Sequence, residues 1–386
     1  MQKKITLIGS TGSIGKQVIE VVERHSNIFK IVAMAANINI DLFAKQVHKL
    51  QPDFAVLRSI NSKDKEKSLL LNNIKLGEQA FEDVCQYPSD IVIVAASGFA
   101  GLKATLCAID AGRTVALANK ESLVVAGELV LKRAREKQVQ IIPIDSEHSA
   151  IWQALHFQTV LTGKKDFKKL LLTASGGALR DMPLDTLKTV TVKEALAHPN
   201  WSMGNKITID CATMLNKGYE VIEAMHLFGA TLEEIEVILH RESIIHSMVE
   251  FIDGSVLAQM GMPSMEIPIQ LALTYPDRLK TKTECIDWQQ LKSLQFDCMT
   301  QERYPCFYLA MQAAKNSGIY PLVLNAWAEI AVNAFLKNRI AYTSIEFMIE
   351  KGLTELHKNQ ALESYLQLEE IDSYQREKAI QSIKLF

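Results

Sequence analysis

The chain has 386 residues, of which 48% are hydrophobic and 22% are charged, and its 42 basic and 44 acidic side chains give a formal net charge of −2. The length predicts more than one domain, the composition is that of a soluble globular protein, and the balanced charge argues against a nucleic-acid or membrane partner. The six cysteines include no CxxC pair, the N-terminal apolar stretch is too short for a signal peptide, and no run approaches a membrane span. We therefore expect a cytoplasmic protein with reduced thiols.

The first 145 residues alternate between short apolar runs and amphipathic stretches. Strands are predicted at residues 4–9, 30–36, 53–57, 90–97, 114–118 and 139–145, with helices such as 15–25 and 122–137 between them. This alternation, with strands that are apolar throughout, predicts an α/β fold with a parallel sheet covered on both faces by helices. We expect a Rossmann-like, doubly wound domain over residues 1–146.

The rest of the chain lacks this strict alternation. Residues 147–277 contain predicted helices at 147–157 and 213–228, a strand at 168–175, and two strands joined by Asp253 and Gly254, a strong hairpin signal. This mixture predicts an α+β domain. Residues 278–303 have no clear periodicity and are expected to form a linker, and residues 304–386 have helical periodicity and predict a C-terminal α-helical domain.

Three glycines separate the first predicted strand from the first predicted helix. Gly9, Gly12 and Gly15 follow the pattern GxxGxxG, which is typical of a turn that brings a phosphate close to backbone N–H groups at a helix N-terminus. The alternative is a glycine-rich turn without a ligand. The second strand ends at Asn37 and Asn39 with no carboxylate for a ribose hydroxyl, which favours NADPH over NADH, although no Arg or Lys stands there for the 2′-phosphate.

Asp145 and Glu147 lie two positions apart at the end of the last predicted parallel strand. In an extended chain such residues project to the same face, and this edge of an open α/β sheet is where ligands bind. Two carboxylates there predict a Mg²⁺ or Mn²⁺ site. The alternative is that Asp145 or Ser146 caps a helix that begins at Glu147.

Two further stretches predict an anion site, and a third predicts a lid. The sequence TASGGALR at 173–180 ends a strand with a serine and two glycines, and Asn216, Lys217 and Glu220 fall within about one helical turn, with the first and last on one face. Together these groups would hold a phosphate beside a metal ion. Between them, HPNWSMGNK at 198–206 predicts an active-site lid, the alternative being an ordinary loop whose Trp201 packs on the core.

The motifs GSTGSIG, ALANKESLV, PIDSEHSAIWQ, TASGGA, HPNWSMG, ATMLNKGYEVIEA and IIHSMVEFIDGSVLAQMG occur in order over residues 5–275. Together they resemble the 1-deoxy-D-xylulose 5-phosphate reductoisomerase family. The resemblance implies a cytoplasmic homodimer that uses NADPH and a divalent metal, Mg²⁺, Mn²⁺ or Co²⁺. Such an enzyme rearranges a small phosphorylated sugar, 1-deoxy-D-xylulose 5-phosphate, and reduces the product to 2-C-methyl-D-erythritol 4-phosphate in the non-mevalonate isoprenoid pathway.

The resemblance also implies roles for individual residues. The implied metal ligands are Asp145, Glu147 and Glu220. The implied substrate contacts are Lys120, Ser146, Glu147, Ser175, His198, Trp201, Met203, Cys211, Asn216, Lys217 and Glu220, of which Lys120, Glu147 and His198 take part in catalysis. The implied NADPH contacts are Gly9, Thr11, Gly12, Ser13, Ile14, Asn39, Asn119, Glu121 and Gly204. His148 and His246 are further candidates for the pocket.

The sequence departs from the family pattern in three places. Cys211 stands where a phosphate-binding serine is usual, and a thiol is a weaker donor than a hydroxyl. Asn37 and Ile38 stand where glycine and a basic residue are usual, which weakens the preference for NADPH. The sequence HRES at 240–243 replaces HPQS, a change expected to be structural.

Two other classes of function explain less of the sequence. Another NAD(P)-dependent dehydrogenase of a phosphorylated small molecule would account for the first domain, but it would not need the Asp145 and Glu147 pair and would survive chelation. A non-catalytic nucleotide sensor would have no use for three carboxylates beside an anion site.

Overall fold

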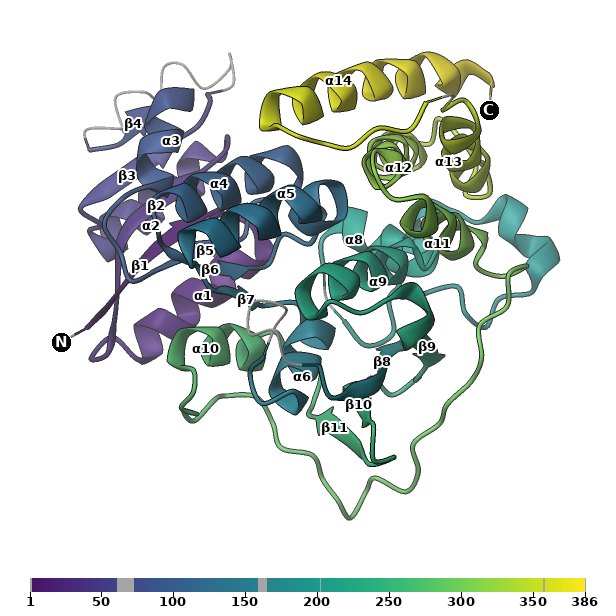
Figure 1. Cartoon of the computed structure of the whole chain (residues 1–386), viewed down its shortest axis with the longest axis horizontal. Helices are drawn as coiled ribbons and strands as arrows, with labels where there is room; N and C mark the ends of the chain where they lie inside the picture. The colour runs from purple at the N-terminus through teal and green to yellow at the C-terminus, as the bar shows by residue number, and fades with distance from the viewer. Residues whose placement is uncertain (1, 61–72, 159–164, 202, 357, 386) are drawn as a thin grey trace. The chain divides into compact units, whose positions relative to one another are not determined.

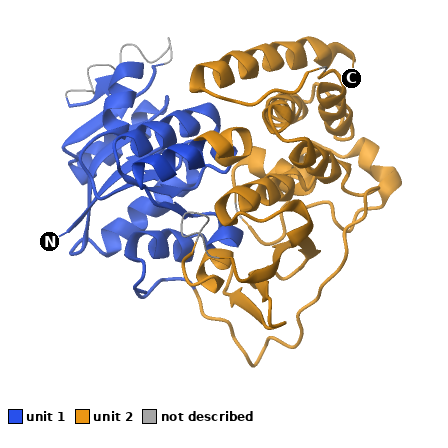
Figure 2. Ribbon diagram, viewed as in Figure 1, with its two compact units in different colours: residues 1–122, 130–149, 264–283 blue, residues 123–129, 150–263, 284–386 orange. Residues whose placement is uncertain are grey.

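The structure, a computed structural model, describes the chain except residues 1, 61–72, 159–164, 202, 357 and 386 (Figure 1). The chain divides into two compact units, each formed by segments that are distant in sequence (Figure 2). Unit 1 comprises residues 1–122, 130–149 and 264–283, and unit 2 comprises residues 123–129, 150–263 and 284–386.

Unit 1 is built on a seven-stranded sheet in which every pairing is parallel. Its strands, in the spatial order β4-β3-β2-β1-β5-β6-β7, are β1 (Lys3–Ile8), β2 (Phe29–Ala36), β3 (Phe54–Leu57), β4 (Lys75–Leu76), β5 (Ile91–Val94), β6 (Thr114–Leu117) and β7 (Ile141–Pro143). The helices that connect them are α1 (Ser13–Arg24), α2 (Ile40–Leu50), α3 (Glu78–Cys85), α4 (Gly98–Asp110) and α5 (Glu121–Lys137). The predicted Rossmann-like fold is confirmed.

The burial of the central strands explains their composition. All four residues of β5 are buried, as are the last four of β1, because helices cover both faces of a parallel sheet. The sequence did not predict β4, which has only two residues, both exposed.

A late segment of the chain returns to unit 1. Helix α10 (Glu266–Thr274) packs beside α1 and β7. Arg24 forms an ion pair with Glu266, His25 lies 3.1 Å from the side-chain oxygen of Gln270, and the Lys3 ammonium donates to the Leu273 carbonyl at 2.8 Å. Unit 1 is therefore completed by residues that follow the predicted catalytic motifs in sequence.

Unit 2 contains a mixed four-stranded sheet in the order β11-β10-β8-β9. Strands β8 (Phe167–Ala174), β10 (Ile245–Phe251) and β11 (Val256–Met260) are antiparallel neighbours, whereas β9 (Ile235–Leu239) pairs parallel to β8. The predicted hairpin is confirmed: Gly254 has φ 84°, and the N–H of Phe251 donates to the Ser255 carbonyl at 2.8 Å. The sequence did not predict β9.

The helices of unit 2 fall into two sets. The first accompanies the sheet and comprises most of α6 (Ser146–Ala154), α7 (Val192–Ala195), α8 (Asn205–Ala212) and α9 (Leu215–Phe228), with short 3-10 turns at Leu184–Thr189 and Leu232–Glu234. The second is the predicted helical C-terminus, α11 (Pro305–Asn316), α12 (Tyr320–Leu336), α13 (Ser344–Thr354) and α14 (Tyr365–Ser382), ending in a 3-10 turn at Ile383–Leu385. Helix α11 packs on α9, and α12 packs on α8, α13 and α14 (Figure 1).

Residues 278–304, all described, form no helix or strand beyond a bridge between Leu239 and Asp297. Among the described residues, no helix combines the length and apolar character needed to cross a bilayer.

Candidate active site

The turn between β1 and α1 has the geometry of a dinucleotide-phosphate turn. Gly9 has φ 90°, and a Cβ there would lie 2.6 Å from the backbone of Ala95, while a Cβ on Gly15 would lie 2.3 Å from the Gly9 carbonyl oxygen. Only glycine fits either position. Helix α1 begins after Gly12, which has no side chain to cap it, so the first-turn N–H groups are available to an anion. Thr11, Ser13 and Ile14 are partly or fully exposed around this turn.

Asn119 and Glu121 form one polar cluster at the start of α5. The Asn119 amide donates to the Glu121 carboxylate at 2.7 Å, and its oxygen accepts the backbone N–H of Ser122 at 3.2 Å. A Cβ on Gly101 would lie 2.3 Å from that same oxygen, so glycine makes room for the Asn119 side chain. Asn39 instead caps α2 by accepting the Leu42 N–H at 3.2 Å.

Lys120 and Asp145 form an ion pair within unit 1, with side chains 9% and 12% exposed. The prediction that Asp145 and Glu147 share one face of an extended strand is wrong, because β7 ends at Pro143 and α6 begins at Ser146. The Asp145 carbonyl accepts the Ser149 N–H at 2.8 Å, so Asp145 precedes a helix whose first turn contains Glu147. The alternative interpretation, in which a helix begins at this point, therefore describes the backbone correctly. Both carboxylates still lie directly after β7.

The start of α9 holds a buried group of polar side chains. The Asn216 amide donates to the Glu220 carboxylate at 2.5 Å, which confirms that these residues share a face, and Lys217 forms an ion pair with Glu220. The side chains of Lys217 and Glu220 are 4% and 1% exposed. Burying two charges is costly even when they are paired, so this pair by itself is weak evidence of stabilisation.

The turn after β8 packs against the end of α8. Gly176 and Gly177 have φ 82° and 74°, and a Cβ on Gly177 would lie 2.5 Å from the Cys211 carbonyl oxygen and 2.7 Å from the Ala212 Cα. Ala174 also shares a buried apolar cluster with Met214, the residue before α9. Within unit 2, the structure therefore brings the turn of Ser175, the backbone of Cys211 and the start of α9 together.

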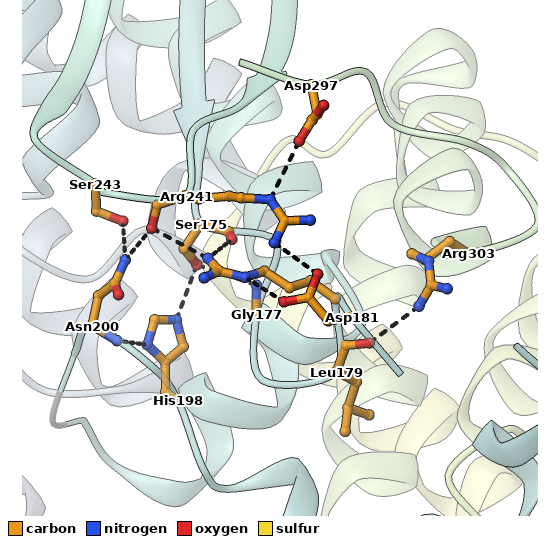
Figure 3. Close-up of polar contacts among 12 residues, drawn as sticks. Ser175, Gly177, Leu179, Asp181, His198, Asn200, Arg241, Ser243, Asp297 and Arg303 are labelled. Atoms are coloured by element: carbon orange, nitrogen blue, oxygen red, sulfur yellow. Dashed lines mark hydrogen bonds and ion pairs between the residues drawn. The ribbon is translucent and has the colours of Figure 1, made fainter. Parts of the chain in front are cut away.

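His198 is held by hydrogen bonds on both ring nitrogens. Nδ1 accepts the backbone N–H groups of Asn200 and Trp201 at 3.2 and 3.0 Å, and Nε2 lies 3.0 Å from the Ser175 hydroxyl (Figure 3). Because Nδ1 is an acceptor, the neutral ring carries its proton on Nε2 and donates it to Ser175. Burial, assisted by the positive charge of Arg180, lowers the pKa of His198 to about 4, so the ring is neutral at physiological pH.

Arg180 and Asn200 belong to this network but were not predicted. The Arg180 guanidinium donates to the carbonyls of Ser175 and Arg241 at 2.7 and 3.2 Å, and the Asn200 amide donates to the Arg241 carbonyl at 2.6 Å and to Ser243 at 2.8 Å (Figure 3). Both residues lie within the quoted motifs, which is the signal that would have identified them.

The HRES departure at 240–243 bears on the same network. The Arg241 side chain pairs with Asp181 at 2.7 Å and with Asp297 at 3.3 Å, while its carbonyl accepts from Arg180 and Asn200. The side chain therefore points away from the carbonyl that the network uses.

The remaining predicted residues lie in the loop at 198–206, in β10 and in α6. The Trp201 ring lies 6.2 Å from that of His246, Met203 is half-buried, and nothing lies within 4 Å of a Cβ built on Gly204, which caps α8. His148 is fully buried in α6, and the Ser146 hydroxyl donates to Glu147 at 2.5 Å. Position 202 of the predicted lid lies outside the described residues.

Three family models match the chain. One, described as 1-deoxy-D-xylulose 5-phosphate reductoisomerase, matches residues 5–127; its C-terminal domain matches residues 141–228; and a DXP reductoisomerase C-terminal domain matches residues 260–378. The chain belongs to the 1-deoxy-D-xylulose 5-phosphate reductoisomerase family. The resemblance inferred from the motifs is confirmed.

Relatives of that name match over nearly the whole chain. The protein from Bacillus cereus strain Q1 is 45% identical over 384 residues, covering 99% of this chain and 100% of the relative, and that from Exiguobacterium sibiricum is 46% identical over 378 residues, covering 97% of each. The solved reductoisomerase of Zymomonas mobilis in complex with NADPH is 37% identical with a TM-score of 0.90, covering 100% of both chains. A DOX-P reductoisomerase in complex with NADPH, fosmidomycin and magnesium is 36% identical with a TM-score of 0.92, covering 100% of this chain and 99% of the other.

Proposed function

We propose that this chain converts 1-deoxy-D-xylulose 5-phosphate to 2-C-methyl-D-erythritol 4-phosphate, using NADPH and a divalent metal, in the non-mevalonate pathway to isoprenoid precursors. The proposal rests on a family match along nearly the whole chain, combined with one structural observation. Each unit contains an acid paired with a lysine at a family motif, Lys120 with Asp145 and Lys217 with Glu220. A dehydrogenase that reduced its substrate without prior rearrangement would not need these acids.

For the metal, we assign Asp145, Glu147 and Glu220 as ligands. Carboxylate oxygens suit Mg²⁺ and Mn²⁺, and Glu220 is a carboxylate with only 1% of its side chain exposed, so a positive charge beside it is required. In this structure the ammonium groups of Lys120 and Lys217 supply positive charge to Asp145 and Glu220. When bound, the ion supplies Lewis-acid stabilisation to oxygen atoms that become negative as the carbon skeleton rearranges.

For the substrate phosphate, we assign Ser175, Cys211, Asn216 and Lys217. Their donors come from the turn after β8, the end of α8 and the start of α9, which pack together within unit 2. Because the His198 ring is neutral, it donates a hydrogen bond to Ser175 but contributes no positive charge to the phosphate site. We assign Trp201 and Met203 to covering the substrate and excluding water, and Ser146 and Lys120 to contacting its oxygen atoms.

For the nucleotide, we assign the turn between β1 and α1 to the pyrophosphate, through Gly9, Thr11, Gly12, Ser13 and Ile14. We also assign contacts with the nucleotide to Asn39, Asn119, Glu121 and Gly204. The uncapped first turn of α1 and the close packing of Gly9 and Gly15 support it.

The assembly and location are part of the same proposal. We propose a cytoplasmic homodimer, and none of the six cysteines is joined in a disulfide, as is usual in a reducing compartment. We also propose that residues 1–146, 147–277 and 304–386 act as nucleotide-binding, catalytic and C-terminal domains, with 278–303 as a linker and 198–206 as a lid.

The test is the rate of NADPH oxidation by the purified protein with 1-deoxy-D-xylulose 5-phosphate, with Mg²⁺ or with EDTA, and identification of the product by mass spectrometry. Metal-dependent oxidation that yields 2-C-methyl-D-erythritol 4-phosphate is expected. Asp145→Asn should raise the Mg²⁺ concentration needed for half-maximal rate, while Asp110→Asn, at an exposed ion pair with Arg133, should leave it unchanged. Oxidation that ignores EDTA would contradict the metal assignment, and the absence of turnover with both NADPH and NADH would contradict the function.

A further inference from the structure

Tyr304 connects the C-terminal helices to the turn after β8. It is the residue before α11, only 2% of it is exposed, and its hydroxyl donates to the Gly176 carbonyl at 3.0 Å across 128 positions of sequence. Its ring packs in the same buried cluster as Ala174 and Met214, which flank the turn and the start of α9. Neither the motifs nor the assigned site residues include Tyr304.

The hydrogen bond from Tyr304 fixes the orientation of one peptide plane. A trans peptide is planar, so the C=O of Gly176 and the N–H of Gly177 point in opposite directions. With the carbonyl held by Tyr304, the Gly177 N–H is directed the other way, and it donates to the Ser175 hydroxyl oxygen at 3.2 Å. A Cβ on Gly176 would lie 3.2 Å from the Tyr304 hydroxyl, so the close approach also depends on the glycine.

This arrangement determines the hydrogen-bonding role of Ser175. A hydroxyl has one proton and two acceptor sites. Its oxygen accepts the Gly177 N–H and the Nε2–H of His198, which lies 3.0 Å away, so both acceptor sites are used. The hydroxyl proton therefore remains to be donated to a further acceptor, and the Arg180 guanidinium, which donates to the Ser175 carbonyl at 2.7 Å, restrains the backbone of Ser175.

We propose that Tyr304 is a positioning residue for the phosphate group of the substrate: by fixing the Gly176–Gly177 peptide, its hydroxyl makes Ser175 a hydrogen-bond donor to that phosphate. The inference rests on the proposed role of Ser175 in phosphate binding. Burial raises the pKa of the Tyr304 hydroxyl, which keeps it protonated and able to donate.

The first test is Tyr304→Phe, which removes the hydroxyl and keeps the ring. KM for 1-deoxy-D-xylulose 5-phosphate should rise about three- to tenfold, the range expected for one hydrogen bond, with kcat and the KM for NADPH unchanged. Inorganic phosphate, used as a competitive inhibitor, should bind more weakly by a similar factor.

The matched control is Gln375→Met. The Gln375 side-chain oxygen accepts the Trp327 indole N–H at 3.0 Å between α14 and α12, and Gln375 is 8% exposed, so the variant loses a comparable buried hydrogen bond that involves neither the turn nor the end of α8. Both variants should lose similar thermal stability, and only Tyr304→Phe should change KM. Equal changes in KM would reduce the effect to general destabilisation and overturn the proposal.

A double-mutant comparison separates this inference from the proposed function. Ser175→Ala alone should raise KM, and adding Tyr304→Phe should raise it no further, because the hydroxyl acts through Ser175. If the two effects multiply, or if Tyr304→Phe is silent while Ser175→Ala is not, the inference on Tyr304 is wrong and the phosphate role of Ser175 stands. If Ser175→Ala leaves KM unchanged, the phosphate assignment itself fails, and the inference with it.

Discussion

Replacing Gly177 by alanine tests the packing of the turn after β8, the proposed anion site, on α8. Gly177 has φ 74°, which costs an L-residue about 1–2 kcal/mol, and the new Cβ would lie 2.5 Å from the Cys211 carbonyl oxygen and 2.7 Å from the Ala212 Cα. No real Cβ tolerates such distances to backbone, so α8 or the turn must move, at a cost of about 1–3 kcal/mol for overpacking. We expect Gly177→Ala to lower the free energy of unfolding of unit 2 by about 2–5 kcal/mol.

The assay is urea denaturation followed by tryptophan fluorescence, which reports on unit 2 because Trp152, Trp201, Trp288 and Trp327 all belong to it. The matched control is Gly254→Ala in the same unit. Gly254 has φ 84° but nothing lies within 4 Å of a Cβ built there, so only the backbone cost of about 1–2 kcal/mol applies. If both variants lose the same stability, the close packing of the turn on α8 is not present and the reasoning about the phosphate site loses its support. KM for the substrate should rise in Gly177→Ala alone.

Two further predictions concern single side chains. Burial lowers the pKa of His226 to about 4, so between the ordinary value of 6.5 and about 4 the unfolded chain binds a proton that the folded chain does not, and stability is lost as the pH falls. The loss of stability due to His226 amounts to at most about 1.4 kcal/mol per pH unit, and His226→Gln should abolish it. The measurement is the free energy of unfolding from urea denaturation at pH 7 and at pH 5. If the variant and the original protein depend on pH equally, His226 does not have the lowered pKa. Cys211→Ser should lower KM for 1-deoxy-D-xylulose 5-phosphate about two- to fivefold, because a hydroxyl donates more strongly than a thiol, and a KM that stays constant would remove Cys211 from the phosphate site.

Local patterns in the sequence predicted much of the fold. The apolar runs of unit 1 predicted six of its strands, because a strand buried on both faces must be apolar throughout. Asp253 and Gly254 predicted the hairpin, because a tight turn needs positive φ at a defined position, and the periodicity after residue 304 predicted the C-terminal helices. The same local information failed for β4, which is too short and exposed to leave a pattern.

The candidate site was predicted only as a set of residue types. Motif spacing correctly placed Asn216 and Glu220 on one helical face, but the assumption of an extended chain placed Asp145 and Glu147 wrongly, since the helix begins between them at Ser146. Spacing also could not indicate the protonation of His198, which follows from two backbone N–H groups that reach its Nδ1 only in the folded loop.

The sequence by itself determined most of the strands and helices, the glycine turn between β1 and α1, and the family, because these depend on residues within one turn or one strand. Only the tertiary structure decided that β9 pairs parallel to β8, that α10 returns to unit 1, and that Tyr304 holds the Gly176 carbonyl. Each of these joins segments at least 60 positions apart. Such contacts form because buried polar groups need hydrogen-bond partners and apolar faces need other segments to pack against. The packing of the whole unit decides which distant segment provides them.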